Sequence, residues 1–275
     1  MQRYSELCLI LKTYPFSERD LVVVLFSENH GKVTALGKGA IHSRRFGGSL
    51  RFLSASRVTF TVKPQTEMAR LEEAATHHEF QNLSIDFERF TIASFMAEFS
   101  LRILEPYAPV RDFFIVLSNA LVQLDTGLHP ALVLNAFLCK SMHVLGYAPH
   151  LSHCIECLNS AAYILESAQS TRSIPFFWDQ TAGGLICHIC AEGHSHQVRK
   201  PLLPSSLQLF HDLTTRPFKE LYQIRSEMNQ SLFKILTDFM FHHIPVLTSG
   251  SGLKSLKLVE DYMHQIPNEI KASFE

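Results

Sequence analysis

The N-terminal quarter of the chain alternates short apolar runs with turn residues, a pattern typical of β-strands. β-Branched and aromatic residues dominate four segments, LCLILKTYPF, DLVVVLFS, GKVTALGKGA and SRVTFTVK. Turn signals separate them at Asn29-His30-Gly31, Gly47-Gly48 and Lys63-Pro64. Several short strands within about 70 residues predict a small barrel, for which the OB-fold is the obvious candidate.

From about residue 80 onward, apolar positions recur at helical spacing. LSIDFERFTIASFMAEFSLRILEP carries one such stripe and stops at Pro106. RDFFIVLSNALVQLD ends before Gly127, and ALVLNAFLCKSMHVLGY ends at Gly146. Three more helices are predicted nearer the C-terminus: SSLQLFHDLTT, EMNQSLFKILTDFMFHHIP and GLKSLKLVEDYMHQ. Such stripes are far more often bundle core than a binding groove, so we expect a helical bundle.

Composition is that of a folded, compact chain. With 275 residues, 46% of them hydrophobic and 19% charged, it can bury one large core or two modest ones. No apolar run approaches the roughly 20 residues that cross a bilayer. The stretch MQRYSELCLILKTYPFSERD lacks the basic, apolar and small-residue regions of a signal peptide. We therefore expect a cytoplasmic protein.

The cysteines divide into two kinds. Cys8 and Cys139 stand in apolar stretches, where a free cysteine packs as a small hydrophobe. Cys154, Cys157, Cys187 and Cys190 form the pattern C-x2-C-x29-C-x2-C. Two Cys-x-x-C turns can hold one tetrahedral Zn2+ and leave no position for water, which indicates a structural zinc site. In a reducing compartment, metal ligation is favoured over disulfides.

Two alternatives to zinc remain open: redox chemistry and a chance arrangement of cysteines. A redox Cys-x-x-C normally occurs as one pair at the start of a helix. Here two pairs flank AAYILESAQSTRSIPFFWDQTAGG, which has turn and strand character. Histidines crowd both pairs; we expect three of them to be surface residues and two to be reserve ligands. The surface residues are His150, His153 and His188, and the reserve ligands are His194 and His196.

The charge is distributed unevenly along the chain. The formal net charge is −1, but residues 1–66 carry ten Lys or Arg against four acidic residues, a local balance of +6. The basic end is therefore the candidate for binding a polyanion. Its loop GKGAIHSRRFGGSLRF, between the third and fourth strands, combines cations for phosphates with phenylalanines for bases. The alternative is an ordinary solvated loop.

Several motifs together resemble the RecO family, the bacterial DNA recombination and repair mediators. They are SERDLVVVLFSENHGKVTALGKGAIHSRRFGGSLRFLS, MAEFSLRILEP, FLCKSMHVLGYAPHLSHCIEC and GGLICHIC. The similarity runs from residue 1 to about 195 in the family's order, and the C-terminal helices fit its remaining part. The expected fold is α+β and multidomain. It has an OB-fold over residues 1–80, a helical bundle over 81–149 and 197–275, and an inserted four-cysteine zinc knuckle domain over 150–196.

The resemblance also implies a function. Such proteins bind single- and double-stranded DNA, anneal complementary strands, and work with RecR to load RecA onto strands covered by single-stranded DNA-binding protein. An apolar pocket of the helical domain binds the acidic, phenylalanine-ended tail of the latter protein. These proteins do not hydrolyse nucleotides, and the chain has no G-x-x-x-x-G-K-[ST] motif.

Carried onto this sequence, the resemblance gives the DNA-contact candidates Lys32, Lys38, Arg44, Arg45, Arg51 and Arg57, with Phe46 as a stacking residue. Ile41 and His42 stand where the family often has basic residues, which weakens the expected phosphate contacts. We therefore rank Lys38, Arg44 and Arg45 first.

Two functions of other classes are alternatives to this one. A zinc-dependent enzyme of the nucleobase deaminase type requires H-x-E, which His77-His78-Glu79 supplies. That signature has proline before its Cys-x-x-C, where this chain has His153, and it has no role for a second pair. A regulator that reads duplex sequence needs a polar recognition helix, whereas these helices are apolar or acidic.

Overall fold

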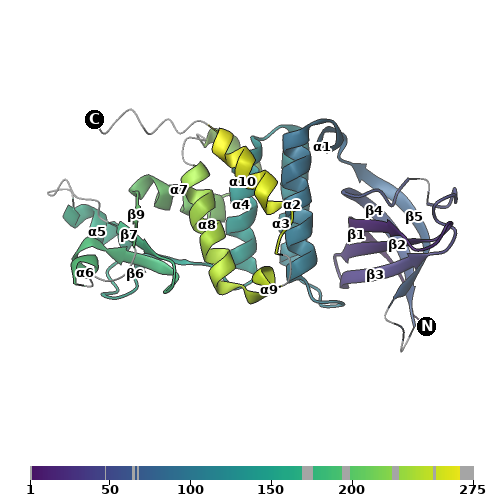
Figure 1. Ribbon diagram of the computed structural model, residues 1–275, viewed down its shortest axis with the longest axis horizontal. Coiled ribbons are helices and arrows are strands. Elements are labelled where there is room, and N and C mark those ends of the chain that lie inside the picture. Colours follow the sequence, from purple (N-terminus) through teal and green to yellow (C-terminus); the bar gives the residue numbers. More distant parts are fainter. Residues whose placement is uncertain are drawn as a thin grey trace. The chain divides into compact units, whose positions relative to one another are not determined.

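Figure 1 labels the helices and strands of the computed structural model. Its chain divides into two compact units. One comprises Met1–Pro130 and Ser251–Val259, and the other comprises Ala131–Gly250 and Glu260–Glu275. The structure describes residues 2–46, 48–63, 66, 68–168, 176–193, 199–224, 229–249 and 252–266. Within these residues, no helix has the length and apolar character needed to cross a bilayer.

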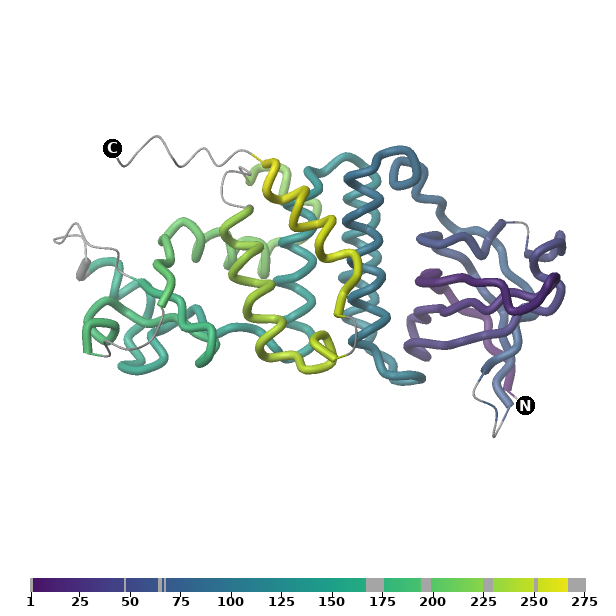
Figure 2. Tube along the Cα trace, viewed as in Figure 1, coloured from purple at the N-terminus to yellow at the C-terminus, as the bar shows by residue number. Residues whose placement is uncertain are grey.

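Five strands of the first unit close into a barrel, as predicted. They are β1 (Gln2–Pro15), β2 (Leu21–Ser27), β3 (Gly31–Gly37), β4 (Ser54–Val62) and β5 (Ala69–Glu79). Their order is β1-β2-β3-β5-β4, and Figure 2 traces them at the purple and blue end of the chain. Every pair is antiparallel except β3 and β5, which close the barrel through a short parallel contact.

The fifth strand was not predicted, because its sequence ARLEEAATHHE is mostly polar. Only Ala69, Leu71 and Ala74 of β5 are buried. Register shifts opposite Ala55/Ser56 and Thr59/Phe60 interrupt the alternation of inward and outward residues. The strand is thus defined by its pairing with β4 rather than by its own hydrophobic pattern.

Strand β2 is buried on both faces. Val23 and Leu25 point into the barrel core. Phe26 is fully buried and lies against the rings of Phe113 and Phe114, with centroids 5.8 and 5.3 Å away. Helix α3 (Arg111–Thr126) therefore covers this outer face of the barrel, and the nearly continuous apolar run VVVLF reflects burial on both sides.

Three helices follow the barrel in the first unit: α1 (Gln81–Ile85), α2 (Phe87–Ile103) and α3 (Arg111–Thr126). The single helix predicted up to Pro106 is in fact broken at Asp86. This residue has extended backbone angles, and its carboxylate caps α2 by accepting from the Arg89 N–H at 3.1 Å. Helix α3 ends at Gly127, as predicted, with φ of 112°.

The second unit contains the remaining helical segments. They are α4 (Pro130–Val144), α7 (Pro204–Thr215), the 3-10 turn η1 (Phe218–Gln223), α8 (Asn229–His243) and α9 (Pro245–Thr248). The last helix, α10 (Leu256–Gln265), begins in the first unit and ends in the second. A helical region is therefore present, as predicted. The residue bounds proposed for the three domains stay predictions.

A small sheet carries the paired cysteines. Its strands are β6 (His150–Cys154), β8 (Gly184–Cys187), β7 (Phe176–Asp179) and β9 (Lys200–Leu202), in that spatial order. Two short helices, α5 (Ala161–Ala168) and α6 (His188–Glu192), accompany them. The expectation of turn and strand throughout residues 161–184 was wrong for α5, where Ile164 gives the helix a buried contact.

Candidate nucleic-acid interface and metal centre

The loop between β3 and β4 is anchored at its middle. Phe46 and Leu50 are 2% and 6% exposed and belong to the barrel core. The Ser49 hydroxyl donates to the Ala74 carbonyl, and the Ser56 hydroxyl donates to the Ser49 carbonyl at 2.6 Å. These contacts anchor Phe46, Ser49 and Leu50 to the barrel, and the charged residues of the loop are exposed.

Five of the predicted cations are exposed on this loop and on β4: Lys38, Arg44, Arg45, Arg51 and Arg57. None of them forms an ion pair with a carboxylate in the part of the chain that the structure describes. Unpaired exposed cations on a fixed frame are suited to phosphate oxygens.

Two of these arginines share a hollow of about 390 Å³. Arg45 and Arg57 line it together with the hydroxyl residues Ser5 and Thr59. Glu73 also lines it and lies 3.9 Å from the Arg3 guanidinium, which offsets part of its charge. The hollow lies on the outer side of β1, β4 and β5, and its donors can take up a phosphate group.

The structure places Lys32 and Phe46 apart from the exposed cations. The Lys32 ammonium donates to the Leu101 carbonyl at 2.9 Å, near the C-terminus of α2. Burial lowers the pKa of Lys32, and the opposite effect of the Glu105 carboxylate only partly offsets it. The buried Phe46 ring offers no face to a base, although the Arg45 guanidinium lies 5.5 Å from its centroid.

The four paired cysteines come together in the second unit. Cys154 ends β6, Cys187 ends β8, and Cys157 and Cys190 follow each of them by one turn. All four sulfurs lie within 4.8 Å of one another, with Cys157 and Cys187 3.8 Å apart. Tetrahedral Zn2+ with bonds of about 2.3 Å spaces its sulfurs about 3.8 Å apart. The cluster can therefore hold a metal ion of this kind.

The backbone favours thiolate at this cluster. Burial raises the pKa of Cys154, but hydrogen bonds from the N–H groups of Cys157, Cys187 and Glu156 outweigh it and lower that pKa to about 7. The Cys187 N–H lies 3.4 Å from the Cys154 sulfur. Burial and the neighbouring thiols raise the pKa of Cys190. Adjacent thiolates repel, so a cation is needed for all four to be ionised together.

Comparison with known proteins identifies the family of the chain. The family model Recombination protein O N terminal matches residues 1–80, and Recombination protein O C terminal matches residues 85–249. The chain belongs to the recombination protein O family. The family resemblance inferred from the motifs is thereby confirmed, and membership gives the chain a role in DNA repair and recombination.

Relatives support membership over the whole length. "DNA repair protein RecO" of Syntrophus aciditrophicus (strain SB) is 28% identical over 263 residues, 92% of this chain and 93% of the relative. The protein of the same name from Desulfosudis oleivorans (strain DSM 6200 / JCM 39069 / Hxd3) is 26% identical over 270 residues, 96% and 100%. That of Rhodopirellula baltica (strain DSM 10527 / NCIMB 13988 / SH1) is 29% identical over 191 residues, 69% and 68%.

In this recombination protein O family member, the deaminase alternative has no support. His77, His78 and Glu79 lie at the end of β5, where the His78 ring is 3.7 Å from the Asp125 carboxylate. Within the described residues, the metal cluster consists of four thiols without a histidine.

The structure places three of the five histidines near the cysteine pairs. His150 is exposed and His153 and His188 are half-buried, whereas His194 and His196 lie outside the described residues.

Sequence reasoning missed one residue of the metal centre, Arg199. Its guanidinium lies 3.1 Å from the carboxylate of Glu156, which stands between the first two cysteines. It also approaches the Cys190 carbonyl at 3.5 Å, and its side chain is 6% exposed. The guanidinium is also 3.9 Å from the Asp179 carboxylate. Arg199 therefore connects the segments that carry the two cysteine pairs. No motif in the sequence marks this residue.

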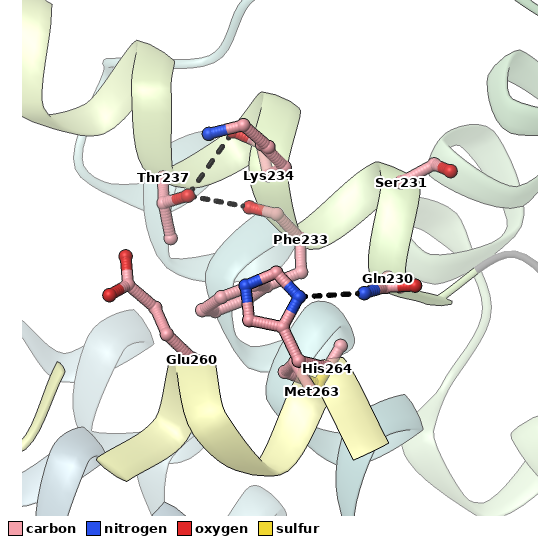
Figure 3. A pocket seen from close by; sticks show the side chains of 8 residues that line it. All are labelled: Gln230, Ser231, Phe233, Lys234, Thr237, Glu260, Met263 and His264. Atoms are coloured by element: carbon pink, nitrogen blue, oxygen red, sulfur yellow. Dashed lines mark hydrogen bonds between the residues drawn. The ribbon is translucent and has the colours of Figure 1, made fainter. Parts of the chain in front are cut away.

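A further hollow of about 310 Å³ lies between α8 and α10 in the second unit (Figure 3). Phe233 and Met263 give it an apolar floor, since they are 4% and 1% exposed. Lys234 and His264 lie at its rim, and His264 is hydrogen-bonded to Gln230 at 3.0 Å. Glu260 also lines the hollow, and the Lys234 ammonium lies 3.4 Å from the Asp238 carboxylate. The apolar depth is suited to an apolar group, and the Lys234 ammonium at the rim is suited to a negative charge beside that group.

Proposed function

We propose that this protein is a non-enzymatic recombination mediator that binds single- and double-stranded DNA and anneals complementary strands. The observation that carries the proposal is the group of five exposed, unpaired cations on the β3–β4 loop and β4. We assign DNA contact to Lys38, Arg44, Arg45, Arg51 and Arg57. Lys32 and Phe46 have structural roles in this proposal.

Electrostatic neutralisation is the proposed mechanism. Phosphate repulsion opposes the meeting of two strands, and a basic surface that contacts both reduces it and raises their local concentration. The hollow between Arg45 and Arg57 holds one phosphate, while Lys38, Arg44 and Arg51 contact the backbone on either side. Pairing of the bases then supplies the driving force, so that neither a catalytic residue nor ATP is required.

The metal has a structural part in this proposal. Cys154, Cys157, Cys187 and Cys190 hold Zn2+, which cross-links β6 to β8. Four thiolates complete a tetrahedral site, so no position is left for a reacting water.

The proposed partners follow from family membership. We infer that the protein acts in the cytoplasm, at the nucleoid, and cooperates with RecR to load RecA onto DNA coated by single-stranded DNA-binding protein. The hollow between α8 and α10 is our assignment for the acidic, phenylalanine-ended tail of that coating protein. The apolar floor suits the phenylalanine ring, and the Lys234 ammonium suits an acidic residue beside it on the side of the hollow away from Glu260.

The test is annealing of two labelled complementary oligonucleotides coated with single-stranded DNA-binding protein, without ATP. We compare wild type with the double variant Arg44→Glu/Arg45→Glu. Lys219→Glu/Lys257→Glu is the matched control, because it makes the same change of charge at exposed lysines elsewhere. Wild type and control should accelerate annealing, and the loop variant should be slower by on the order of tenfold or more. Equal rates for all three proteins would remove the loop from the site.

A further inference from the structure

The end of β1 and the turn that joins it to β2, residues 14–20 and here called the aromatic turn, expose two aromatic rings. Tyr14 is 41% exposed and Phe16 is 60% exposed. The turn is held by its own hydrogen bonds: the Phe16 N–H donates to the Asp20 carbonyl at 2.9 Å, and the Asp20 N–H donates to the Ser17 hydroxyl at 3.1 Å. Both rings therefore stand on a fixed frame without a hydrophobic cover of their own.

Two hydrogen bonds fasten this turn to the basic loop. The Gly39 N–H donates to the Asp20 carboxylate at 2.8 Å, and the Ile41 N–H donates to the Arg19 carbonyl at 3.2 Å. Gly39 directly follows Lys38, which is one of the proposed phosphate contacts. The aromatic turn is thus continuous with the proposed DNA surface, although it is more than twenty residues away from the loop's arginines in sequence.

The aromatic turn has cations on it and beside it. The Lys12 ammonium lies 5.5 Å from the centroid of the Tyr14 ring. Arg19 and Lys38 are exposed, and the Asp20 carboxylate is engaged by the Gly39 N–H. Glu18 is an exposed acid on the turn. Aromatic faces among cations fit a polyanion that also presents flat, unsatisfied rings, which is the chemistry of unpaired nucleobases.

We propose that Tyr14 and Phe16 stack on unpaired bases of single-stranded DNA whose phosphates are bound by Lys38 and the β3–β4 loop. This inference rests on the proposed function and adds a preference for strand type. In a duplex each base already stacks on its neighbours and is closed to a side-chain ring. The cations thus bind either form of DNA, and the aromatic turn selects the single strand.

The experiment compares wild type, Tyr14→Leu/Phe16→Leu and the control Tyr222→Leu, in which an exposed tyrosine elsewhere is changed. Affinity is measured by fluorescence anisotropy at several salt concentrations. The probes are a twenty-nucleotide oligothymidylate, an abasic strand of the same length and a duplex of the same length. Thermal unfolding of each variant checks its fold. Leucine keeps an apolar side chain and removes the aromatic ring, at Tyr14 together with its hydroxyl.

We expect the double variant to bind the oligothymidylate about tenfold more weakly for each ring lost, with an unchanged salt slope. Its affinity for the duplex and the abasic strand should equal that of wild type and control. Equal loss on all three probes, or no loss on any of them, would overturn the inference. The latter result would direct the search to a protein partner for the turn.

Failure of the stacking role and failure of the proposed function give different results. If Arg44→Glu/Arg45→Glu lowers affinity and salt slope while Tyr14→Leu/Phe16→Leu changes nothing, the proposed function stands and the stacking role fails. If wild type itself binds no strand, the proposed function fails.

Discussion

The carboxylate of Glu98 on α2 accepts hydrogen bonds from both the backbone N–H and the hydroxyl of Ser255, 157 residues further along the chain. A third bond comes from the Lys254 N–H at 2.9 Å. Ser255 immediately precedes α10, so Glu98 fixes the start of the last helix on the unit that contains the barrel.

This carboxylate should make stability depend on pH. Burial raises the pKa of Glu98, but the bonds from Ser255 and Lys254 outweigh it and hold the pKa below the ordinary 4.5. The ionised group therefore stabilises the fold in full above about pH 4.5, and this contribution is lost as the pH falls through the folded pKa. Glu98→Gln should cost about 1–2 kcal/mol at pH 7 and progressively less below pH 4.5.

Urea unfolding of wild type, Glu98→Gln and the control Glu260→Gln across this pH range measures the difference. Glu260 is an exposed residue of α10, and its variant should follow wild type. A pH-independent cost of Glu98→Gln would show that the charge is not the source of the stabilisation.

Loss of one cluster thiol should release the metal. Cys154→Ser and Cys187→Ser should each reduce zinc from about one ion per chain to nearly none, because a site with three thiolates loses its closed tetrahedral shell. Elemental analysis of protein purified without chelator gives the zinc content. Hydrogen exchange should rise over residues 150–202 and remain at the wild-type level in the barrel.

Cys139→Ala is the matched control for these variants. It removes a thiol that is fully buried in α4, and burial raises its pKa, so it should keep the metal. Wild-type protein without zinc would contradict the assignment of the ion.

Substitution of Lys32 should affect the stability of the protein, and substitution of Lys38 should affect its DNA binding. Lys32→Met leaves the Leu101 carbonyl without its donor and should destabilise the protein by about 1–3 kcal/mol, with unchanged DNA affinity. Lys38→Met should leave stability unchanged and lower both the affinity and its salt slope. Unfolding curves and a salt series on each variant give the comparison, and the opposite pattern would return Lys32 to the interface.

Phe46 should contribute to the stability of the barrel and not to the stacking of DNA bases. Phe46→Ala opens a cavity in the core and should cost about 3–5 kcal/mol. Phe46→Leu preserves most of the packing and should bind single-stranded DNA as wild type does. Phe16→Ala, at an exposed ring, should change stability by less than about 0.5 kcal/mol. A clear loss of affinity in folded Phe46→Leu would contradict the packing role.

The hollow between α8 and α10 should bind an acidic peptide that ends in phenylalanine. Lys234→Glu places negative charge at its rim and should weaken that binding by about tenfold, measured by anisotropy of a labelled peptide. Lys219→Glu is the control at an exposed lysine outside the hollow. Equal affinity of the two variants would exclude this hollow as the peptide site.

Much of the fold could be predicted because local sequence defines it. The β-branched runs gave four of the five barrel strands, and Gly127 gave the end of α3. Cysteine spacing gave all members of the metal cluster, since each Cys-x-x-C turn is a local structure. Cys8 and Cys139 are fully buried, as their apolar surroundings predicted.

The remaining features depend on residues distant in sequence. Strand β5 is defined by β4, and the burial of Phe46 depends on how its loop folds over the barrel. Alternation along β3 puts Lys32 on the outer face but says nothing of the helix that covers that face. Arg199 is joined to Glu156 across 43 residues, a separation over which no periodic pattern applies.

The strand order of the barrel has a consequence for co-translational folding. β1 pairs with β4, so that Gln2 meets Val62 and Leu9 meets Ala55, and β5 closes the ring only at Glu79. The ribosome adds about 5–20 residues per second. After β1 and β2 have been synthesised, several seconds therefore pass before the chain reaches the end of β5, and during this time the partner strands that complete the barrel are missing. The nascent chain should therefore recruit a holding chaperone in this interval, and slowed translation between codons 28 and 79 should prolong that contact.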